Sequence, residues 1–135
     1  MALEVNFKNK LLDEMSRRGF FVYATHNTIR AGVPDVHAVL VGKAYWIELK
    51  VACKFDNNKA TLQHRLGACQ SKFLRDVADA GGFGAAMIEL PDGDVGVVTA
   101  DKLSPGPHRS FEILEPLSLV ESIEWISKFA TESAS

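Results

Sequence analysis

The fold expected for this chain is decided by Gly32-Val33-Pro34-Asp35 together with Glu48-Leu49-Lys50. The first stretch leads into an apolar run over residues 36–40, and the second lies inside a run of aromatic and β-branched residues over 45–51. Such runs predict two β-strands, and Gly42-Lys43 between them is a turn signal. Because a two-residue loop that begins with glycine suits a type II′ turn, we expect a β-hairpin closed on these two residues.

The register of this hairpin decides where its charged side chains lie. A loop at Gly42-Lys43 gives three pairs: Val41 with Ala44, His37 with Glu48, and Asp35 with Lys50. Opposed residues share a face of a sheet, and so do alternate residues of one strand. Asp35, Glu48 and Lys50 are therefore expected on one face. The other face of the second strand is expected to enter the core through Tyr45, Ile47, Leu49 and Val51.

Two carboxylates and a lysine on one face indicate a particular chemistry. Carboxylates held side by side repel each other, and one resists ionisation unless a cation neutralises the pair. Mg²⁺ or Mn²⁺ suits this role, because hard divalent ions take oxygen ligands, polarise a phosphoryl oxygen and activate a water. A neighbouring lysine stabilises the negative charge that develops. Asp35 and Glu48 are thus candidate metal ligands, Lys50 is the candidate catalytic cation, and phosphodiester hydrolysis is the expected reaction.

These residues resemble the signature of the PD-(D/E)XK nuclease superfamily: Pro34-Asp35, then Glu48-Leu49-Lys50. The surroundings are similar to its VRR-NUC branch, whose small stand-alone proteins occur in phages and bacteria and resemble archaeal Holliday-junction resolvases. The features that carry this likeness are Arg30 to Asp35, the strand that ends at Lys50, and Gln70 at the start of a segment with Phe73, Leu74 and Gly81-Gly82. The resemblance covers roughly Leu11 to Glu89.

The resemblance implies a fold and a site. The fold is α/β, a restriction-endonuclease-like αβββαβ core with a mixed sheet, to which the sequence adds a C-terminal helix. The activity is that of a Mg²⁺-dependent endodeoxyribonuclease. We expect the Leu49 backbone carbonyl to complete the protein's share of the metal coordination, and Glu14 on the first helix to join the acidic site. Gln70 would orient the lysine or a water, with Gln63 as a rival for that role. His37 and the His26-Asn27 pair are weaker candidates for contacts with the metal-bound water or the DNA.

Hydrophobic periodicity and turn residues predict the remaining elements. The expected helices cover residues 5–18, ended by Gly19, a segment from Gln63 or Leu66 to Ala80, and 117–131. Strands are expected over 20–25, 83–90, 95–99 and, at an edge, 110–114. Residues 51–62 are expected to be irregular, with a turn at Asp56-Asn57-Asn58. The second helix would serve as the crossover to a parallel strand.

Length and composition indicate one nuclease domain over residues 1–135, with a core of about 5–99 and a C-terminal extension of about 100–135. Neither a bilayer-spanning run nor a signal-peptide pattern is present, so a cytoplasmic location in a bacterium or a phage-infected host is expected. Two cysteines, Cys53 and Cys69, make no disulfide framework. Together with His64 they lack the paired spacing and the fourth ligand of a structural zinc site.

The charge is unevenly distributed along the chain. Although the net charge is −2, residues 1–75 hold twelve Lys and Arg against six Asp and Glu, and residues 76–135 hold three against eleven. Phosphate binding depends on local positive charge, so the first half is the expected DNA-binding part. Candidate phosphate contacts are Arg17, Arg18, Arg30, Lys54, Lys59, Arg65 and Lys72.

The substrate and the assembly state are less constrained. A small domain without an added recognition module has little surface for reading base edges, so DNA structure, above all branched DNA or a Holliday junction, is the expected determinant. A flap-, end- or non-specific DNA nuclease and a catalytically idle nucleic-acid-binding module are the alternatives. The resembled relatives act as homodimers, and Trp125, one position off the apolar stripe of the last helix, is a candidate partner contact.

Overall fold

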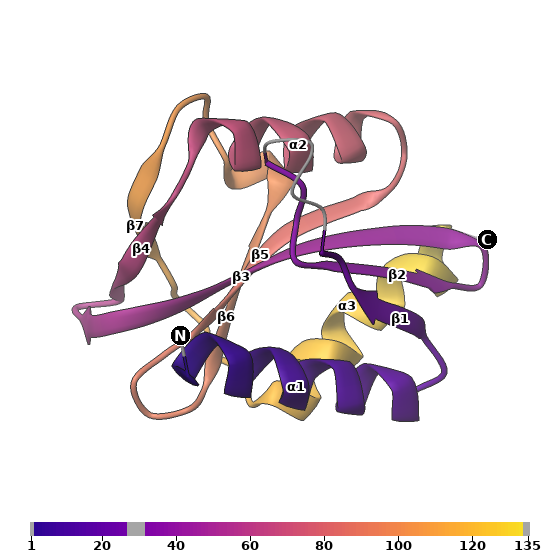
Figure 1. Cartoon of the computed structure of the whole chain (residues 1–135), viewed down its shortest axis with the longest axis horizontal. Coiled ribbons are helices and arrows are strands. Elements are labelled where there is room, and N and C mark those ends of the chain that lie inside the picture. Colours follow the sequence, from indigo (N-terminus) through magenta and orange to yellow (C-terminus); the bar gives the residue numbers. More distant parts are fainter. Residues whose placement is uncertain (1, 27–31, 134–135) are drawn as a thin grey trace.

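The computed structural model describes residues 2–26 and 32–133. Their strands form a mixed β-sheet, and their helices pack against it (Figure 1). The elements in chain order are α1 (Ala2–Arg17), β1 (Phe21–Ala24), β2 (Val36–Leu40), β3 (Lys43–Asp56), β4 (Lys59–Leu66), α2 (Ala68–Asp79), β5 (Phe83–Glu89), β6 (Val95–Thr99), the 3₁₀ turn η1 (Ala100–Lys102), β7 (His108–Glu112) and α3 (Leu119–Ser133).

The main sheet has the strand order β1-β2-β3-β5-β6, and β3 lies at its centre. Strands β3 and β5 are parallel and all other neighbours are antiparallel. The expected crossover is confirmed, because α2 connects the β3–β4 hairpin to β5. The far end of β3 leaves the main sheet and pairs with β4, which in turn pairs with β7. Strand β3 therefore belongs to both parts of the sheet.

The β2–β3 hairpin forms, but its register differs from the expected one by two residues. Leu40 pairs with Lys43, so the loop is Val41-Gly42 and not Gly42-Lys43. Both loop residues have positive φ, 50° at Val41 and 75° at Gly42, which is the signature of a type I′ turn and not of type II′. Types I′ and II′ both match the right-handed twist of the strands, so the observed register carries the local cost of a valine in the left-handed region. His37 consequently lies opposite Trp46 and not opposite Glu48.

The largest error of the sequence interpretation concerns residues 51–62. They are not irregular, because β3 runs on to Asp56 and β4 starts at Lys59. The turn was correctly placed: Asn57 and Asn58 form its loop with positive φ values of 51° and 64°. Asparagine tolerates this conformation, which explains how polar residues continue a hairpin here. The following helix begins only at Ala68, after β4 has ended.

Two hydrophobic clusters cover the two faces of the main sheet. On one face α1 and α3 bring Phe7, Leu11, Met15, Ile123 and Ile126 against Tyr45, Ile47 and Leu49. On the other face α2, β4 and β7 bring Leu74, Leu62, Leu66 and Phe111 against Ala86 and Ile88, with Trp46 at the border. Residues beyond 100 thus contribute to both clusters. Glu48 and Lys50 alternate with the first set and lie on the α2 side.

The strained turn residue yields a stability prediction. Val41 is 64 % exposed and has a φ of 50°, so its replacement removes little buried surface. Val41→Asn should raise the free energy of unfolding by about 1 kcal/mol, since asparagine accepts the left-handed region at lower cost. Val41→Ile, which keeps the branched Cβ, should bring no gain. Urea unfolding followed by circular dichroism measures both variants, and equal stability of the two would contradict the turn assignment.

Candidate active site

The centre of the site is a pair of charged side chains buried on the α2 side of β3. Glu48 is 2 % exposed and Lys50 is 7 % exposed. The lysine Nζ lies 3.7 Å from Glu48 Oε2. Charged groups lose hydration when they are buried, so such residues are retained only where partners compensate the loss.

Asp35 joins this pair from the position just before β2. Its Oδ2 accepts a hydrogen bond of 3.0 Å from the Leu49 backbone N–H. In an antiparallel ladder the N–H and C=O groups of one residue point to the same side of the strand. The Leu49 carbonyl therefore points to the side on which Asp35 lies. Since the register error is an even number of residues, the expected alternation of faces is unchanged.

Gln70 connects the first turn of α2 to the buried glutamate. Its Oε1 accepts a hydrogen bond of 2.7 Å from the Gly67 backbone N–H, the glutamine half of a capping box. This contact fixes the orientation of the amide, so Nε2 points the other way and donates a 2.7 Å hydrogen bond to Glu48 Oε2. The alternative, Gln63, lies exposed on β4. The amide of Gln70 thus positions the glutamate.

Two glycines allow α2 to approach the sheet and the Asp35 loop. A Cβ on Gly32, which has a φ of +84°, would lie 2.6 Å from the Cys69 carbonyl oxygen. A Cβ on Gly84 in β5 would lie 2.4 Å from the Leu74 carbonyl oxygen. Both distances are shorter than any Cβ contact that a folded chain tolerates, so glycine is required at each position. The N-terminus of α2 is thereby held over Glu48.

The electrostatic state of Glu48 is strongly perturbed. Burial, and then the negative charge of Asp35, raise the pKa of Glu48 from 4.5 to about 8, although the Lys50 ammonium group opposes the rise. Oε2 has Gln70 and Lys50 as neighbours, whereas Oε1 is buried and has no hydrogen-bond partner among the described residues. A buried, unpartnered carboxylate oxygen beside a second carboxylate is a favourable place for a cation.

The donor set fits a hard divalent cation. Asp35, Glu48 and the Leu49 carbonyl offer only oxygen atoms, which Mg²⁺ and Mn²⁺ prefer. Within residues 2–26 and 32–133 no group of three or more His, Cys, Asp or Glu side chains is suited to hold a metal ion. A metal at this site would therefore depend on two carboxylates, a backbone carbonyl and water, as Mg²⁺ commonly does.

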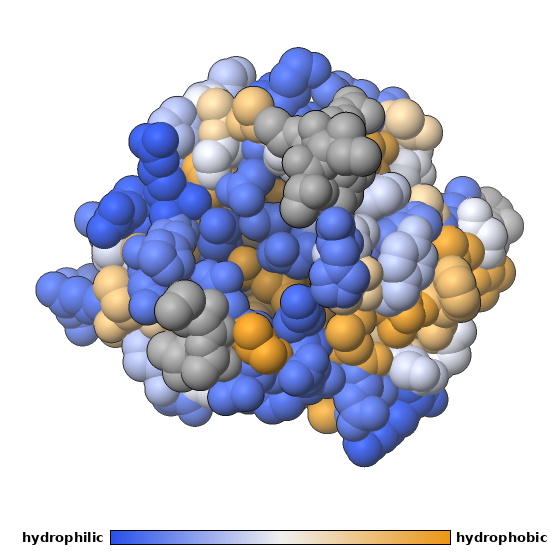
Figure 2. All heavy atoms as spheres, viewed as in Figure 1, coloured by the Kyte–Doolittle hydropathy of each residue, from blue (hydrophilic) through white to orange (hydrophobic). Residues whose placement is uncertain are grey.

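Two glutamates of the first helix bear on the expected role of Glu14 in the acidic site, which stays a prediction. Glu14 lies near the C-terminal end of α1 and pairs with Arg17 at 3.6 Å and Arg18 at 3.5 Å, so its carboxylate is engaged there. The α1 residue whose charge reaches Glu48 is Glu4, which adds to the rise of the Glu48 pKa. In Figure 2 the face is hollowed where β3 passes between α2 and the first turns of α1, and mainly hydrophilic residues wall the hollow. Sequence spacing gave no signal for Glu4, because α1 begins earlier than expected.

Six of the seven basic residues proposed from the sequence lie in the described part of the chain, and these six fall into two groups. Four are engaged in ion pairs: Arg17 with Asp13, Arg18 with Glu124, Lys54 with Asp56, and Lys72 with Asp76. Lys59 and Arg65 lie exposed on β4, and none of the ion pairs between described residues includes them. Arg30 lies outside the described residues, as does Asn27, while the neighbouring His26 is exposed. Of Lys59 and Arg65, Arg65 is the closer in sequence to Gly67 and Gln70.

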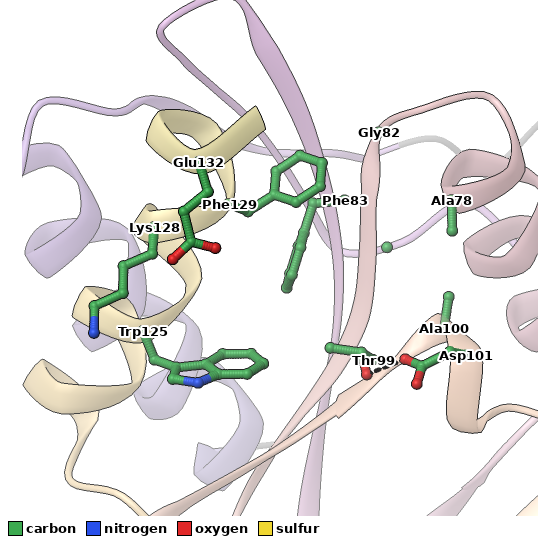
Figure 3. A pocket seen from close by; sticks show the side chains of 11 residues that line it. Ala78, Gly82, Phe83, Thr99, Ala100, Asp101, Trp125, Lys128, Phe129 and Glu132 are labelled. Atoms are coloured by element: carbon green, nitrogen blue, oxygen red, sulfur yellow. Dashed lines mark hydrogen bonds between the residues drawn. The ribbon is translucent and has the colours of Figure 1, made fainter. Parts of the chain in front are cut away.

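Two cavities lie at the opposite edge of the sheet and contain none of these side chains. One of about 430 Å³ is formed by α3, the start of β5 and η1, with Trp125, Phe129 and Phe83 around it (Figure 3). The other, about 690 Å³, follows β6 and β7 and shares Trp125 and Asp101 with the first. Trp125 is 46 % exposed. These cavities are thus separate from the acidic site.

Among the described residues, the helices lack the length and the apolar composition needed to span a membrane.

The raised pKa of Glu48 predicts how stability depends on pH. The folded state binds the proton of Glu48 more tightly than the unfolded state does. The contribution of this proton to the free energy of unfolding is therefore fully present below pH 4.5 and is lost as the pH rises through about 8. In EDTA, we expect the melting temperature to fall between pH 5.5 and pH 8.5. Glu48→Gln should largely remove this fall, because a neutral amide replaces the group that titrates. Thermal melts of both proteins at matched pH test this, and parallel profiles would contradict it.

Comparisons with known proteins agree with this architecture. No protein-family model and no curated protein sequence matches the chain. Among solved structures, the chain is similar to Hjc, a Holliday junction resolvase from Archaeoglobus fulgidus, with a TM-score of 0.64, 16 % identity, and coverage of 88 % of this chain and 98 % of that one. It is also similar to a bacterial homing endonuclease, with a TM-score of 0.58, 11 % identity, and coverage of 99 % and 96 %. The chain has the restriction-endonuclease-like α/β fold of these two nucleases.

Proposed function

We propose that this protein is a divalent-metal-dependent DNA endonuclease that hydrolyses phosphodiester bonds at the site formed by Asp35, Glu48 and Lys50. The observation that carries the proposal is the buried Oε1 of Glu48, which has no hydrogen-bond partner among the described residues and lies beside a second carboxylate. Such an arrangement is unfavourable for the folded protein alone and becomes favourable when a cation binds. The similarity of the fold to two nucleases supports the same proposal of a nuclease.

Each residue has a distinct role in the proposed reaction. Asp35, Glu48 and the Leu49 carbonyl would hold the metal, and a bound Mg²⁺ or Mn²⁺ would supply a polarised phosphoryl oxygen and a more acidic water. The Lys50 ammonium group, beside Glu48, would stabilise the negative charge that develops on the phosphate. Gln70 would hold Glu48 in a single orientation through its capped amide.

The substrate proposed is branched DNA, with a Holliday junction as the first structure to test. The fold similarity to a Holliday junction resolvase supports this choice. Membership in the VRR-NUC branch, a cytoplasmic location and a homodimer are further parts of the proposal. The exposed indole of Trp125 and the cavities beside α3 would be the contact surface of such a homodimer, at the sheet edge away from the acidic site.

The first test is metal-dependent cleavage by the purified chain. With Mg²⁺ or Mn²⁺, we expect cuts in synthetic four-way junctions and flaps, and none in EDTA. Asp35→Ala, Glu48→Ala and Lys50→Ala should each lower the cleavage rate by about a hundredfold or more, since each removes charge that the transition state needs. Circular dichroism spectra of the variants control for folding. Full activity of Asp35→Ala would refute the site, and DNA binding without any cleavage would favour a catalytically idle module.

A second test separates the two glutamates of α1. Glu4→Gln should lower the cleavage rate roughly tenfold and raise the Mg²⁺ concentration needed, because a residue that acts on a metal ligand from outside typically has an effect of this size. Glu14→Gln is the matched control, since that carboxylate pairs with Arg17 and Arg18. It should keep the rate within about twofold. The opposite order of effects would restore Glu14 as the acidic residue of the site.

A further inference from the structure

Five ring side chains form a continuous stripe across the sheet, from the free edge of β1 to α2. Neighbouring ring centroids lie 5.8 Å apart between Phe21 and Tyr23, 5.3 Å between Tyr23 and His37, 4.1 Å between His37 and Trp46, and 5.2 Å between Trp46 and Phe73. The His37 ring stacks on Trp46 at an interplanar angle of 28°, and its Nδ1 lies 2.9 Å from the Tyr23 hydroxyl oxygen. The order of the stripe is therefore fixed by contacts along its whole length.

The stripe lies on the same face as the acidic site and next to it. Tyr23 pairs with His37 and His37 pairs with Trp46, so these three form one row across β1, β2 and β3. Glu48 follows Trp46 by two residues on the same face. From the spacing of strands and residues, the Tyr23 position is roughly 12 Å from the Glu48 position. A group bound at Tyr23 would thus lie a few nucleotides from a phosphate at the site.

The outer end of the stripe is open to solvent. Phe21 is 68 % exposed and Tyr23 is 44 % exposed. Figure 2 shows hydrophobic residues gathered over β1 and the end of the β2–β3 hairpin. Among the described strands β1 pairs only with β2, so it is an edge strand, a place where charged side chains usually discourage unwanted pairing. Two exposed rings at such an edge are costly unless they serve a partner.

The chemistry of this surface suits nucleobases joined by phosphates. Aromatic rings stack on any base, because every base presents a π-face. Between Phe20 and Trp46 the only carboxylate is Asp35 at the site itself, while Lys43 and Arg30 are cations, so the sequence around the stripe adds no charge that repels phosphate. The stripe also belongs to the half of the chain that carries the excess of Lys and Arg.

We propose that Phe21 and Tyr23, backed by His37, Trp46 and Phe73, form a stacking platform for unpaired bases of the DNA that enters the active site. This inference rests on the proposed function and, among the branched DNAs proposed there, favours flaps and other structures that carry unpaired nucleotides a few positions from the cleaved bond over a fully paired four-way junction. Bases inside a duplex are already stacked on each other, so only unpaired ones can stack on the protein.

The test measures base stacking apart from cleavage. The full chain is titrated in EDTA against two fluorescent single strands of about twelve nucleotides, one of thymidine and one with abasic residues throughout. The two carry the same phosphates, so the ratio of their Kd values reports the bases alone. We expect the thymidine strand to bind at least about fivefold more tightly.

Variants assign this preference to the stripe. Phe21→Leu combined with Tyr23→Leu should bring the ratio to within about twofold, whereas Tyr23→Phe, which keeps the ring, should retain it. Val120→Ala on α3 is the control, because this apolar side chain is exposed to a similar degree, 41 %, and lies outside the stripe. If the double variant melts below the assay temperature, Phe21→Leu alone replaces it, since that ring is the most exposed of the five.

Three outcomes would overturn the platform. These are equal binding of both strands by the wild-type chain, an unchanged ratio in the double variant, and a change from dimer to monomer in sedimentation on loss of the two rings, which would assign the stripe to self-association. Cleavage assays distinguish the two proposals. Cleavage without a preference for bases would contradict the stacking platform alone. A preference for bases without any cleavage would contradict the nuclease proposal alone.

Discussion

The burial of one carboxylate is the constraint that the surrounding structure has to satisfy. Glu48 lies at the middle of the central strand, 2 % exposed, between the negative charge of Asp35 and the ammonium group of Lys50. Burial of such a group opposes folding, and the surrounding architecture is what makes it tolerable. Strand β3 fixes Glu48 and Lys50 on one face, the loop after Gly32 presents Asp35, and the capped amide of Gln70 donates to one glutamate oxygen. The other oxygen is buried and has no hydrogen-bond partner among the described residues.

The local pattern of residues predicted the hairpin, the α2 crossover and the shared face of Asp35, Glu48 and Lys50, because alternation in a strand follows from backbone geometry. It did not predict the register, because loops at Gly42-Lys43 and at Val41-Gly42 both form primed turns that match the strand twist, and the observed register is contrary to the residue preference at Val41. A valine at a φ of 50° is contrary to its local preference. The error was harmless for the site only because it was an even number of residues.

Two other differences have tertiary causes. The polar residues after Val51 look irregular in sequence, but β3 continues through them because β4 and β7 supply a partner on that side. Glu14 matched the expected position on the first helix by approximate spacing, yet the rotation and length of α1 direct it to Arg17 and Arg18 and bring Glu4 within electrostatic range of Glu48. Contacts between distant elements decided the path of β3 and the proximity of Glu4 to Glu48, whereas the pairing of Glu14 with Arg17 and Arg18 is local to α1, at i,i+3 and i,i+4 spacing.

The two edges of the main sheet have different surfaces, and this asymmetry constrains how the protein can be used. At the β6 edge α3 leaves cavities lined by Trp125 and Phe129, with acidic residues such as Asp101 and Glu132 beside them, which disfavours phosphate. At the β1 edge the rings of Phe21 and Tyr23 are exposed, on the face that carries the buried glutamate. A nucleic acid bound as proposed would therefore meet less repulsion at the β1 edge than at the β6 edge. A protein partner, including a second copy of this chain, would meet no such competition at the β6 edge, so both could bind at the same time.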